Sequence, residues 1–358
     1  MKKSIALVLV LLMALATLTG CGGSSSSSST STSSGSESTS ADAPEEKNVT
    51  LRIHCDFTED HPTSVLLQEF CDHVYEETNG TLKIQPYWAS TLGDYTVVFD
   101  EVVQGTIDMT FSCPSTTYGD AFNIGVLPYL AANWDELAQM MSPDSFIFKT
   151  TYDACDEIGV KLLGMHSTGA GVLATTKEVT DYGTWGTPKG ILIRVPNADY
   201  FSIPFQAMGY NTQGINWSEI FTSLQTGVID GFVGGQAAGV YDQFRDICTH
   251  VYYINNFYEI ALVAINKATF ESLSENQQAA LTKWSNWVYE ENCKRGPELE
   301  EETMQKLADY GLTVVVPTDE ELQNLSTGCR EEVWPELVDS MLGEGGYDNL
   351  MAYLDTLN

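Results

Sequence analysis

The sequence predicts an α/β fold built from two lobes, on three observations. Strand and helix patterns alternate between residues 49 and 112, in the order strand–helix–strand–helix–strand of a parallel sheet with crossing helices. A second set of strand and helix patterns begins near Val160. About 310 residues follow the N-terminal region, which is more than one hydrophobic core usually accommodates.

The first set of elements shows clear starts and stops. Apolar and polar residues alternate after Val49, as in a half-buried strand. A helix opens at His61-Pro62 and ends at Thr78-Asn79-Gly80, where Gly80 suits a left-handed cap. A second helix covers Asp94 to Val103 and is stopped by Gly105. The patterns predict strands over 49–57, 82–87 and 107–112.

The second set ends in a long helix. The patterns predict strands over 160–165, 171–175, 191–195, 229–233 and 261–266, and a helix over 217–226 ended by Gly227. A further helix extends from Ser274 to about Leu307, and Ser274 and Gln277 fit a capping box at its start. We expect this helix to be continuous unless Gly296-Pro297 breaks it.

The N-terminus has the pattern of a bacterial lipoprotein signal. Lys2 and Lys3 precede an apolar run that is too short to span a bilayer comfortably, and Leu18-Thr19-Gly20-Cys21 resembles a lipobox. We therefore predict a signal peptide over 1–20 and a lipid on Cys21; the alternative is an ordinary signal peptide with a chance cysteine. Residues 21–47 are rich in Ser, Thr and Gly, which predicts a disordered tether spanning roughly 25–30 Å.

Charge and cysteine spacing exclude several classes of site. The formal net charge is -32, from 17 basic and 49 acidic residues, which argues against nucleic acid and anionic lipid as partners. An anionic ligand therefore needs a local cationic group. The eight cysteines include no metal-ligand spacing, so we predict no metal site. Seven remain besides Cys21, so at least one is unpaired within the chain.

The sequence carries no positive sign of an enzyme. A nucleophile elbow, a zinc-protease helix, a phosphate loop and a dinucleotide fingerprint are all absent. The five histidines do not pair at ligand spacing. We therefore predict a protein that catalyses no reaction, although unrecognised chemistry stays open as an alternative.

Arg194 is the candidate ligand-binding cation. The chain has five arginines, and this one lies near the end of an apolar strand, just before Pro196. Open α/β sheets bind ligands at the carboxyl ends of their strands. A guanidinium there offers a planar, two-pronged donor to a carboxylate. The alternative, equally favoured by the bare sequence, is a structural arginine paired with an acid from the other lobe.

Six motifs in order resemble one family, the solute receptors of tripartite ATP-independent periplasmic (TRAP) transporters of the dicarboxylate-receptor type. The resemblance covers about Leu51 to Leu337. The motifs are Thr78-Asn79-Gly80-Thr81-Leu82-Lys83-Ile84; Leu92-Gly93-Asp94; residues 103–109; Leu127-Pro128-Tyr129; Lys189-Gly190-Ile191-Leu192-Ile193-Arg194-Val195-Pro196-Asn197; and residues 217–231. Each is weak alone, and their shared order is what makes the resemblance specific.

The resemblance implies a two-lobed periplasmic-binding-protein fold of type II, with a sheet and helices in each lobe and with crossing segments and a long helix joining the lobes. It places lobe I at 48–171 and about 260–302, and lobe II at 172–259 and about 303–358. It assigns a ligand role to Arg194 and Trp217. Loops that follow family strands and motifs add Ser112, Cys113, Asp56 and Tyr95, each with simple packing as the alternative.

Two departures from the family pattern bear on the ligand. Many relatives carry a second arginine where this chain has apolar Val172 or Leu173. Many also carry Glu-Asn-Pro where this chain has Gly234 and Gly235, so backbone N–H groups or Gln236 would bind there. One cationic group with two aromatics favours a single carboxylate on an apolar or hydroxylated body.

The predicted function is capture of a small organic acid by an extracytoplasmic, lipid-anchored protein. The resemblance implies delivery to TRAP permease subunits in the membrane, an ion gradient as the driving force, and no cofactor. The alternative is a lipoprotein that senses a ligand and reports to a signalling partner. Neighbouring genes for a permease or for a sensor kinase would separate these two.

Overall fold

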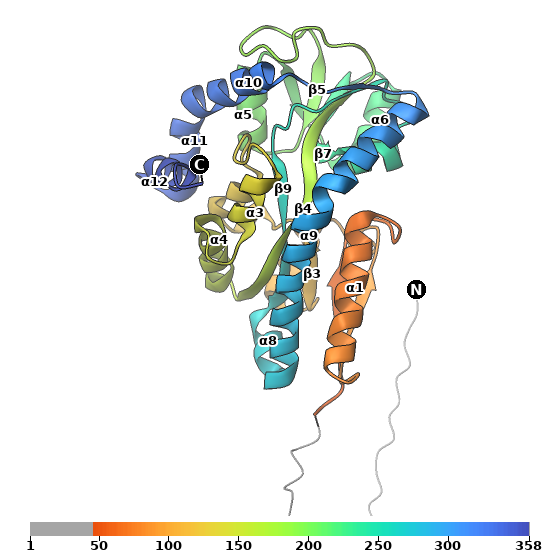
Figure 1. The fold of residues 1–358 in the computed structure, drawn as a ribbon, viewed down its shortest axis with the longest axis vertical. Helices are drawn as coiled ribbons and strands as arrows, with labels where there is room; N and C mark the ends of the chain where they lie inside the picture. The colour runs from red at the N-terminus through yellow and green to blue at the C-terminus, as the bar shows by residue number, and fades with distance from the viewer. Residues whose placement is uncertain (1–45, 358) are drawn as a thin grey trace, which may run out of the picture. The chain divides into compact units, whose positions relative to one another are not determined.

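The computed structural model describes residues 46–357, and these residues have a mixed α/β fold in which helices flank a central sheet (Figure 1). The predicted fold class is confirmed. The predicted signal peptide at 1–20, the lipidation of Cys21 and nearly all of the tether at 21–47 lie outside these residues. Within the described range, no helix has the length and apolar character needed to cross a membrane.

The elements follow one another along residues 46–357 in an alternating order. The strands are β1 Val49–His54, β2 Leu82–Tyr87, β3 Met109–Ser112, β4 Val160–Thr175, β5 Leu192–Val195, β6 Asn211–Gly214, β7 Gly231–Gln236, β8 His250–Tyr252, β9 Tyr258–Asn266 and β10 Thr313–Val315. The helices are α1 Pro62–Glu77, α2 Tyr95–Gln104, α3 Trp134–Met141, α4 Phe146–Glu157, α5 Asp199–Ala207, α6 Ile220–Gln225, α7 Ala237–Gly239, α8 Lys267–Ser272, α9 Glu275–Tyr310, α10 Asp319–Glu332, α11 Trp334–Leu342 and α12 Gly346–Leu354. Short helical turns are η1 Thr116–Tyr118, η2 Asp120–Val126, η3 Trp217–Glu219 and η4 Val240–Phe244.

The strands pair in the order β2-β1-β3-β9-β4-β7-β5-β6, with β8 pairing both β4 and β10. β1 is parallel to β2 and β3, as the alternation of strands and helices predicts. β5 is likewise parallel to β6 and β7. β4 and β9 are antiparallel and lie between these two parallel groups, so they connect the two halves of the sheet.

One predicted break is wrong: 160–165 and 171–175 are parts of one 16-residue strand, β4. Its first part pairs with β9, and its last residues pair with β7 and β8. The register shifts between Ser167 and Ala170, where Gly169 has a φ of 113°. The polar and glycine residues that suggest a loop in the sequence therefore form a bulge.

The helix boundaries follow local chemistry. His61 caps α1 by accepting a hydrogen bond from the Thr63 backbone N–H through Nδ1. Gly80 follows α1 with a φ of 80°, and Gly105 caps α2 in the left-handed region, as predicted. The predicted 217–226 helix is instead divided into η3 and α6.

The long helix α9 is continuous over 36 residues, so Pro297 does not break it. The residue before a proline is normally pushed out of the helical region by its own Cβ, and here that residue is Gly296. The capping box of Ser274 and Gln277 is formed, as predicted. α9 packs against β4 and α1 and, further along, against β10, so it lies beside both halves of the sheet (Figure 1).

The cysteines contribute thiols to the interior. The seven cysteines within residues 46–357 are all free, and five of them are buried: Cys55, Cys71, Cys155, Cys248 and Cys329. The predicted surplus of unpaired cysteines therefore extends to every cysteine in this range.

Candidate functional site

Arg194 is a buried cation on β5 with spare hydrogen-bond donors. Only 5% of its surface is exposed. Nε donates to the Ile215 carbonyl oxygen at 2.7 Å, and Nη1 donates to the Val233 carbonyl oxygen at 2.9 Å. A guanidinium has five N–H donors, so one on Nη1 and both on Nη2 have no partner among residues 46–357.

Arg194 has no acidic partner within ion-pair distance in the described part of the chain. The structural alternative, an arginine paired with an acid of the other lobe, is therefore wrong for these residues. Burial lowers the pKa of Arg194 to about 10, so the side chain is still a cation at neutral pH. A buried charge without a counter-ion is costly, and an anionic ligand would remove that cost.

The two glycines after Val233 make room for Arg194 and its neighbour. A Cβ on Gly234 would lie 2.7 Å from Pro196 Cγ and 3.0 Å from Arg194 Nη1, and the φ of this glycine is 85°. A Cβ on Gly235 would lie 2.7 Å from Cη2 of Trp217. The glycine pair that departs from the family pattern thus allows both side chains to pack against the end of β7.

Trp217 forms the aromatic wall of this site. It is half-buried at the start of η3, and Arg194 Cζ lies 5.7 Å from its ring centroid, within cation–π range. Its ring packs edge-on against Phe232 and Phe244 at centroid distances of 5.8 Å and 5.3 Å. Two aromatic neighbours in the core therefore hold the indole beside the guanidinium.

Gln236, at the end of β7, contacts a glutamate that the sequence reasoning did not single out. Gln236 is 6% exposed, and its Nε2 donates to Glu259 Oε2 at 2.7 Å. Thr168 Oγ1 donates to the same oxygen at 2.6 Å. Burial raises the pKa of Glu259, while these two hydrogen bonds and one involving Cys113 lower it. Glu259 therefore lies beside two predicted site residues, Gln236 and Cys113.

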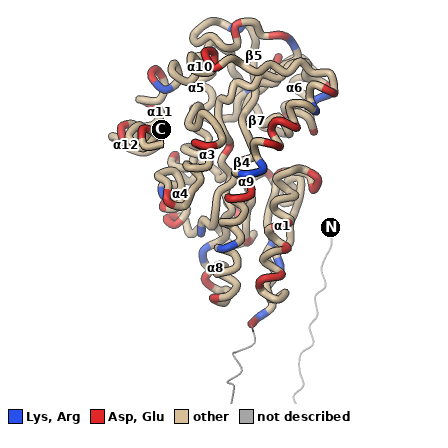
Figure 2. The backbone as a smooth tube through the Cα atoms, viewed as in Figure 1, with Lys and Arg blue, Asp and Glu red and all other residues tan. Residues whose placement is uncertain are grey.

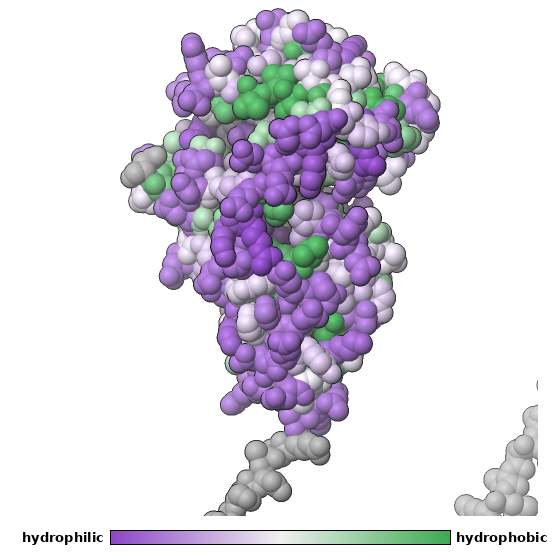
Figure 3. Space-filling model, turned by 45° about the vertical axis from the view of Figure 1, so that its right-hand side comes forward, coloured by the Kyte–Doolittle hydropathy of each residue, from purple (hydrophilic) through white to green (hydrophobic). Residues whose placement is uncertain are grey.

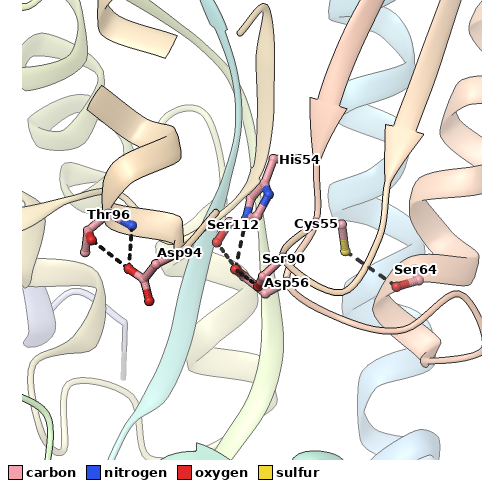
Figure 4. Close-up of polar contacts among 8 residues, drawn as sticks. All are labelled: His54, Cys55, Asp56, Ser64, Ser90, Asp94, Thr96 and Ser112. Atoms are coloured by element: carbon pink, nitrogen blue, oxygen red, sulfur yellow. Dashed lines mark hydrogen bonds and ion pairs between the residues drawn. The ribbon is translucent and has the colours of Figure 1, made fainter. Parts of the chain in front are cut away.

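Asp56 organises a second polar cluster at the ends of β1 and β3 (Figure 4). Its Oδ1 contacts His54 Nε2 at 2.9 Å and accepts from Ser90 Oγ at 3.2 Å. Ser112 Oγ donates to Oδ2 of the same carboxylate. Asp56 and Ser112, predicted from separate loops, therefore meet directly.

Tyr95 and Cys113 lie close enough to charged groups of the two clusters for those groups to shift their pKa values. Burial raises the pKa of the Tyr95 hydroxyl above its ordinary value; the charges of Cys113 and Glu259 raise it further, and Arg194 lowers it. Burial likewise raises the pKa of the Cys113 thiol, and Glu259 and Asp56 add to the shift. Tyr200, which was not predicted from the sequence, is also buried; Glu259 raises its pKa further and Arg194 lowers it. We call Arg194, Trp217, Tyr95, Cys113 and Glu259 the Arg194 site.

A separate cavity of about 270 Å³ adjoins this region where α1 begins beside α9. It shares Gln236 and Thr168 with the contacts above, but Arg194 and Trp217 do not line it. Its arginine, Arg295, is already paired with Glu69 and Glu291. The cavity therefore offers no free cation to an acid. The face in Figure 3 is mostly hydrophilic, with a hollow near its middle beside hydrophobic atoms.

The surface charge of the protein does not attract anions from a distance. Figure 2 shows Lys and Arg scattered among more numerous Asp and Glu. The net charge therefore does not steer an anion to the protein, and any anion site needs a local cation.

One signal for Glu259 was present in the sequence. It is the single charged residue in the run Tyr258-Glu259-Ile260-Ala261-Leu262-Val263-Ala264-Ile265. A charge within a strand that is otherwise apolar needs partners if it is buried. Its partners, Thr168 and Gln236, are 91 and 23 residues away, so only the tertiary structure identifies them.

Comparisons with known proteins give a consistent result. The family model of the bacterial extracellular solute-binding proteins, family 7, matches residues 56–339. The 2,3-diketo-L-gulonate-binding periplasmic protein of Escherichia coli is 23% identical over 272 residues, which are 75% of this chain and 82% of that protein.

Two crystal structures have the same fold. A TRAP periplasmic solute-binding protein from Haemophilus influenzae with bound L-gulonate has a TM-score of 0.75 and 21% identity, covering 86% of this chain and 99% of that chain. A second, from Chromohalobacter salexigens with bound D-glucuronate, has a TM-score of 0.76 and 21% identity, covering 86% and 100%.

Proposed function

Because the chain belongs to the bacterial extracellular solute-binding proteins of family 7, we propose that it captures a small organic acid and delivers it to a TRAP permease. The resemblance drawn from the six motifs is confirmed at the level of the family. The family consists of solute-binding proteins, so the chain is a binding protein and not an enzyme.

The observation that carries the proposal is the buried guanidinium of Arg194. It is held in place by two backbone carbonyls, has three free N–H donors, and has no carboxylate partner within the described residues. A ligand carboxylate is the group that satisfies this geometry, because a guanidinium binds it through two parallel hydrogen bonds.

We propose a hydroxylated monocarboxylate as the ligand. Val172 and Leu173, where many relatives carry a second arginine, are fully buried in the core and offer no second cation. The structurally similar proteins bind L-gulonate and D-glucuronate, both acids with a single carboxylate. Trp217 supplies an aromatic face for the body of such a ligand, and Asp56, Glu259 and Tyr95 supply polar groups.

Thermal-shift and calorimetric titrations test this proposal with matched pairs. D-glucuronate should raise the melting temperature. Binding to the native state alone stabilises it by about 2.7 kcal/mol when the ligand is in hundredfold excess over Kd. D-glucuronamide has the same body without the charge and should bind far more weakly. The same comparison applies to L-gulonate and its neutral lactone. Equal stabilisation by the acid and its neutral partner would contradict a carboxylate site at Arg194.

We propose the lipid anchor and the two lobes as parts of the same function. Cys21 would hold the protein at the outer face of the membrane, with residues 21–47 as a tether. Lobe I would contain 48–171 and about 260–302, and lobe II 172–259 and about 303–358, with β4, β9 and α9 passing between them. A sensing lipoprotein with the same ligand remains the alternative.

Transport and sensing are separated by one uptake experiment. Membrane vesicles that contain a TRAP permease from the source cells should accumulate labelled D-glucuronate only when this protein is added. Arg194→Ala should abolish that accumulation. Normal accumulation without the protein would contradict a role in delivery.

A further inference from the structure

We propose that Glu259 is a specificity-determining residue of the Arg194 site: its carboxylate accepts a hydrogen bond from a hydroxyl or ammonium group of the ligand whose own carboxylate is held by Arg194. The inference rests on the proposed function and narrows its ligand class. It excludes acids with a purely apolar body as good ligands.

The first support is the place of Glu259 in an apolar strand. Its neighbours on β9, Tyr258 and Ile260, are 5% and 3% exposed, whereas Glu259 is half-buried. A carboxylate in such a strand costs free energy unless hydrogen bonds compensate for lost water. Thr168 and Gln236 provide two, at 2.6 Å and 2.7 Å.

The second support is the acceptor that stays open. Both of those hydrogen bonds end on Oε2. Within residues 46–357 the further side-chain partner of Glu259 is the Cys113 thiol, a weak donor. A carboxylate has about four acceptor positions, so Oε1 keeps room for a strong donor. Cys113 lies at the end of β3, on the same side as the Asp56 cluster.

The third support is the position of Glu259 relative to Arg194. Nη1 of Arg194 is bonded to Val233 O, and Gln236, three residues further along β7, is bonded to Glu259. Three residues of a strand span about 10 Å at most. The two charged groups therefore lie near the same end of β7, close enough that the charge of Glu259 raises the pKa of Arg194, so a six-carbon acid is a suitable probe of both.

The fourth support is the charge balance. Arg194 is the cation whose charge acts on Tyr95 and Tyr200, and Glu259 and Asp56 both act on the nearby Cys113 thiol. An acid with an apolar tail would neutralise Arg194 but leave Glu259 desolvated without a new partner. A buried acceptor left without a donor costs binding energy, so a ligand that donates there is favoured.

Calorimetry with three six-carbon probes tests the inference. L-gulonate carries hydroxyl donors, 6-aminohexanoate carries a terminal ammonium, and hexanoate carries neither. We expect wild type to bind L-gulonate or 6-aminohexanoate at least tenfold more tightly than hexanoate. The tighter of the two identifies the donor as hydroxyl or ammonium.

Glu259→Gln is the decisive variant, because its amide oxygen can still accept from Thr168 and Gln236. A ligand hydroxyl can turn to accept from the new amide, so L-gulonate should weaken by about tenfold, whereas 6-aminohexanoate should weaken by about a hundredfold. Hexanoate should stay within threefold. Glu259→Asp, a second variant in case the first does not fold, should retain hexanoate binding and lose part of the preference.

Glu300→Gln is the matched control. Glu300 is another half-buried glutamate, and burial raises its pKa as well. It lines the separate cavity, where its Oε2 accepts a hydrogen bond from Trp134 Nε1 at 2.9 Å. Its replacement should leave all three affinities unchanged. Two results would overturn the inference but not the proposed acid site. One is that hexanoate binds as tightly as the other probes, and the other is that the preference for L-gulonate or 6-aminohexanoate over hexanoate persists in Glu259→Gln. Failure of all three acids to bind wild type overturns the proposed acid site as well.

Discussion

Replacement of Arg194 by alanine should weaken ligand binding far more than it weakens the fold. The guanidinium is 5% exposed, and three of its donors are available to a ligand carboxylate. Removal of one partner of a buried, hydrogen-bonded charge pair costs about 2–5 kcal/mol. We therefore expect Kd to rise by roughly 30-fold to several thousand-fold.

The effect on stability has opposing contributions. Alanine leaves the carbonyls of Ile215 and Val233 without their donor, and hydrogen bonds to a charged group each contribute about 1.5–3 kcal/mol. It also removes a buried, unpaired charge, which offsets part of that loss. Arg194→Lys should restore only part of the affinity, because an ammonium keeps the charge but not the planar fork.

Arg330 is the matched control for this experiment. Its guanidinium is also held by backbone carbonyls, at 2.7 Å from Tyr129 O and 3.3 Å from Leu130 O, and lies over the Trp334 ring. Arg330→Ala should lower the free energy of unfolding in urea and leave Kd unchanged. Calorimetry with D-glucuronate and urea melts of the apo proteins measure both quantities. If Arg194→Ala behaves like Arg330→Ala, with Kd within threefold of wild type, Arg194 is structural and the reasoning fails.

Four further predictions concern other parts of the chain. Cys21→Ser should release a folded, soluble protein from the membrane fraction; persistent membrane association would contradict the lipobox. Solution scattering should show a smaller radius of gyration with saturating ligand, because closure of two lobes brings them together, and an unchanged profile would exclude hinge motion. Gly171→Ala should destabilise by about 1–3 kcal/mol in urea unfolding, because its Cβ would lie 2.1 Å from the Phe257 ring. His166 is stacked on Phe111 with both ring nitrogens unpaired, and burial lowers its pKa to about 3. The His166 imidazole takes up a proton near pH 6.5 in the unfolded chain but not in the folded chain. Its contribution to the free energy of unfolding should therefore fall by about 1.4 kcal/mol per pH unit below pH 6.5, and His166→Phe should flatten this slope.

Local patterns in the sequence were sufficient for the first half of the sheet. The alternation after Val49 and the glycines at Gly80 and Gly105 define β1, α1 and α2, because strand periodicity and left-handed caps depend on neighbouring residues alone. The capping box at Ser274 likewise marks the start of α9. The order of these elements was enough to predict the parallel pairing of β1 with its neighbours.

The sequence did not reveal that β4 continues through Ser167–Ala170. Its polar and glycine residues indicate a loop, and only pairing with β9, β7 and β8 keeps the segment extended. Pro297 is a similar case, because a proline normally ends a helix, and the packing of the preceding Gly296 against Trp134 is not visible locally.

The sequence by itself determined the fold class and the family and, through the family motif, singled out Arg194 as the candidate cation, because these depend on periodicity and on motifs of adjacent residues. The tertiary structure decided what Arg194 contacts, since its carbonyl partners on Ile215 and Val233 lie 21 and 39 residues away. It also brought Glu259 of β9 to Gln236 of β7 and Thr168 of β4, a contact between three strands. Side chains that meet through folding leave no fixed spacing in the chain, and this is the physical reason that Arg194 was predicted from the sequence and Glu259 was not.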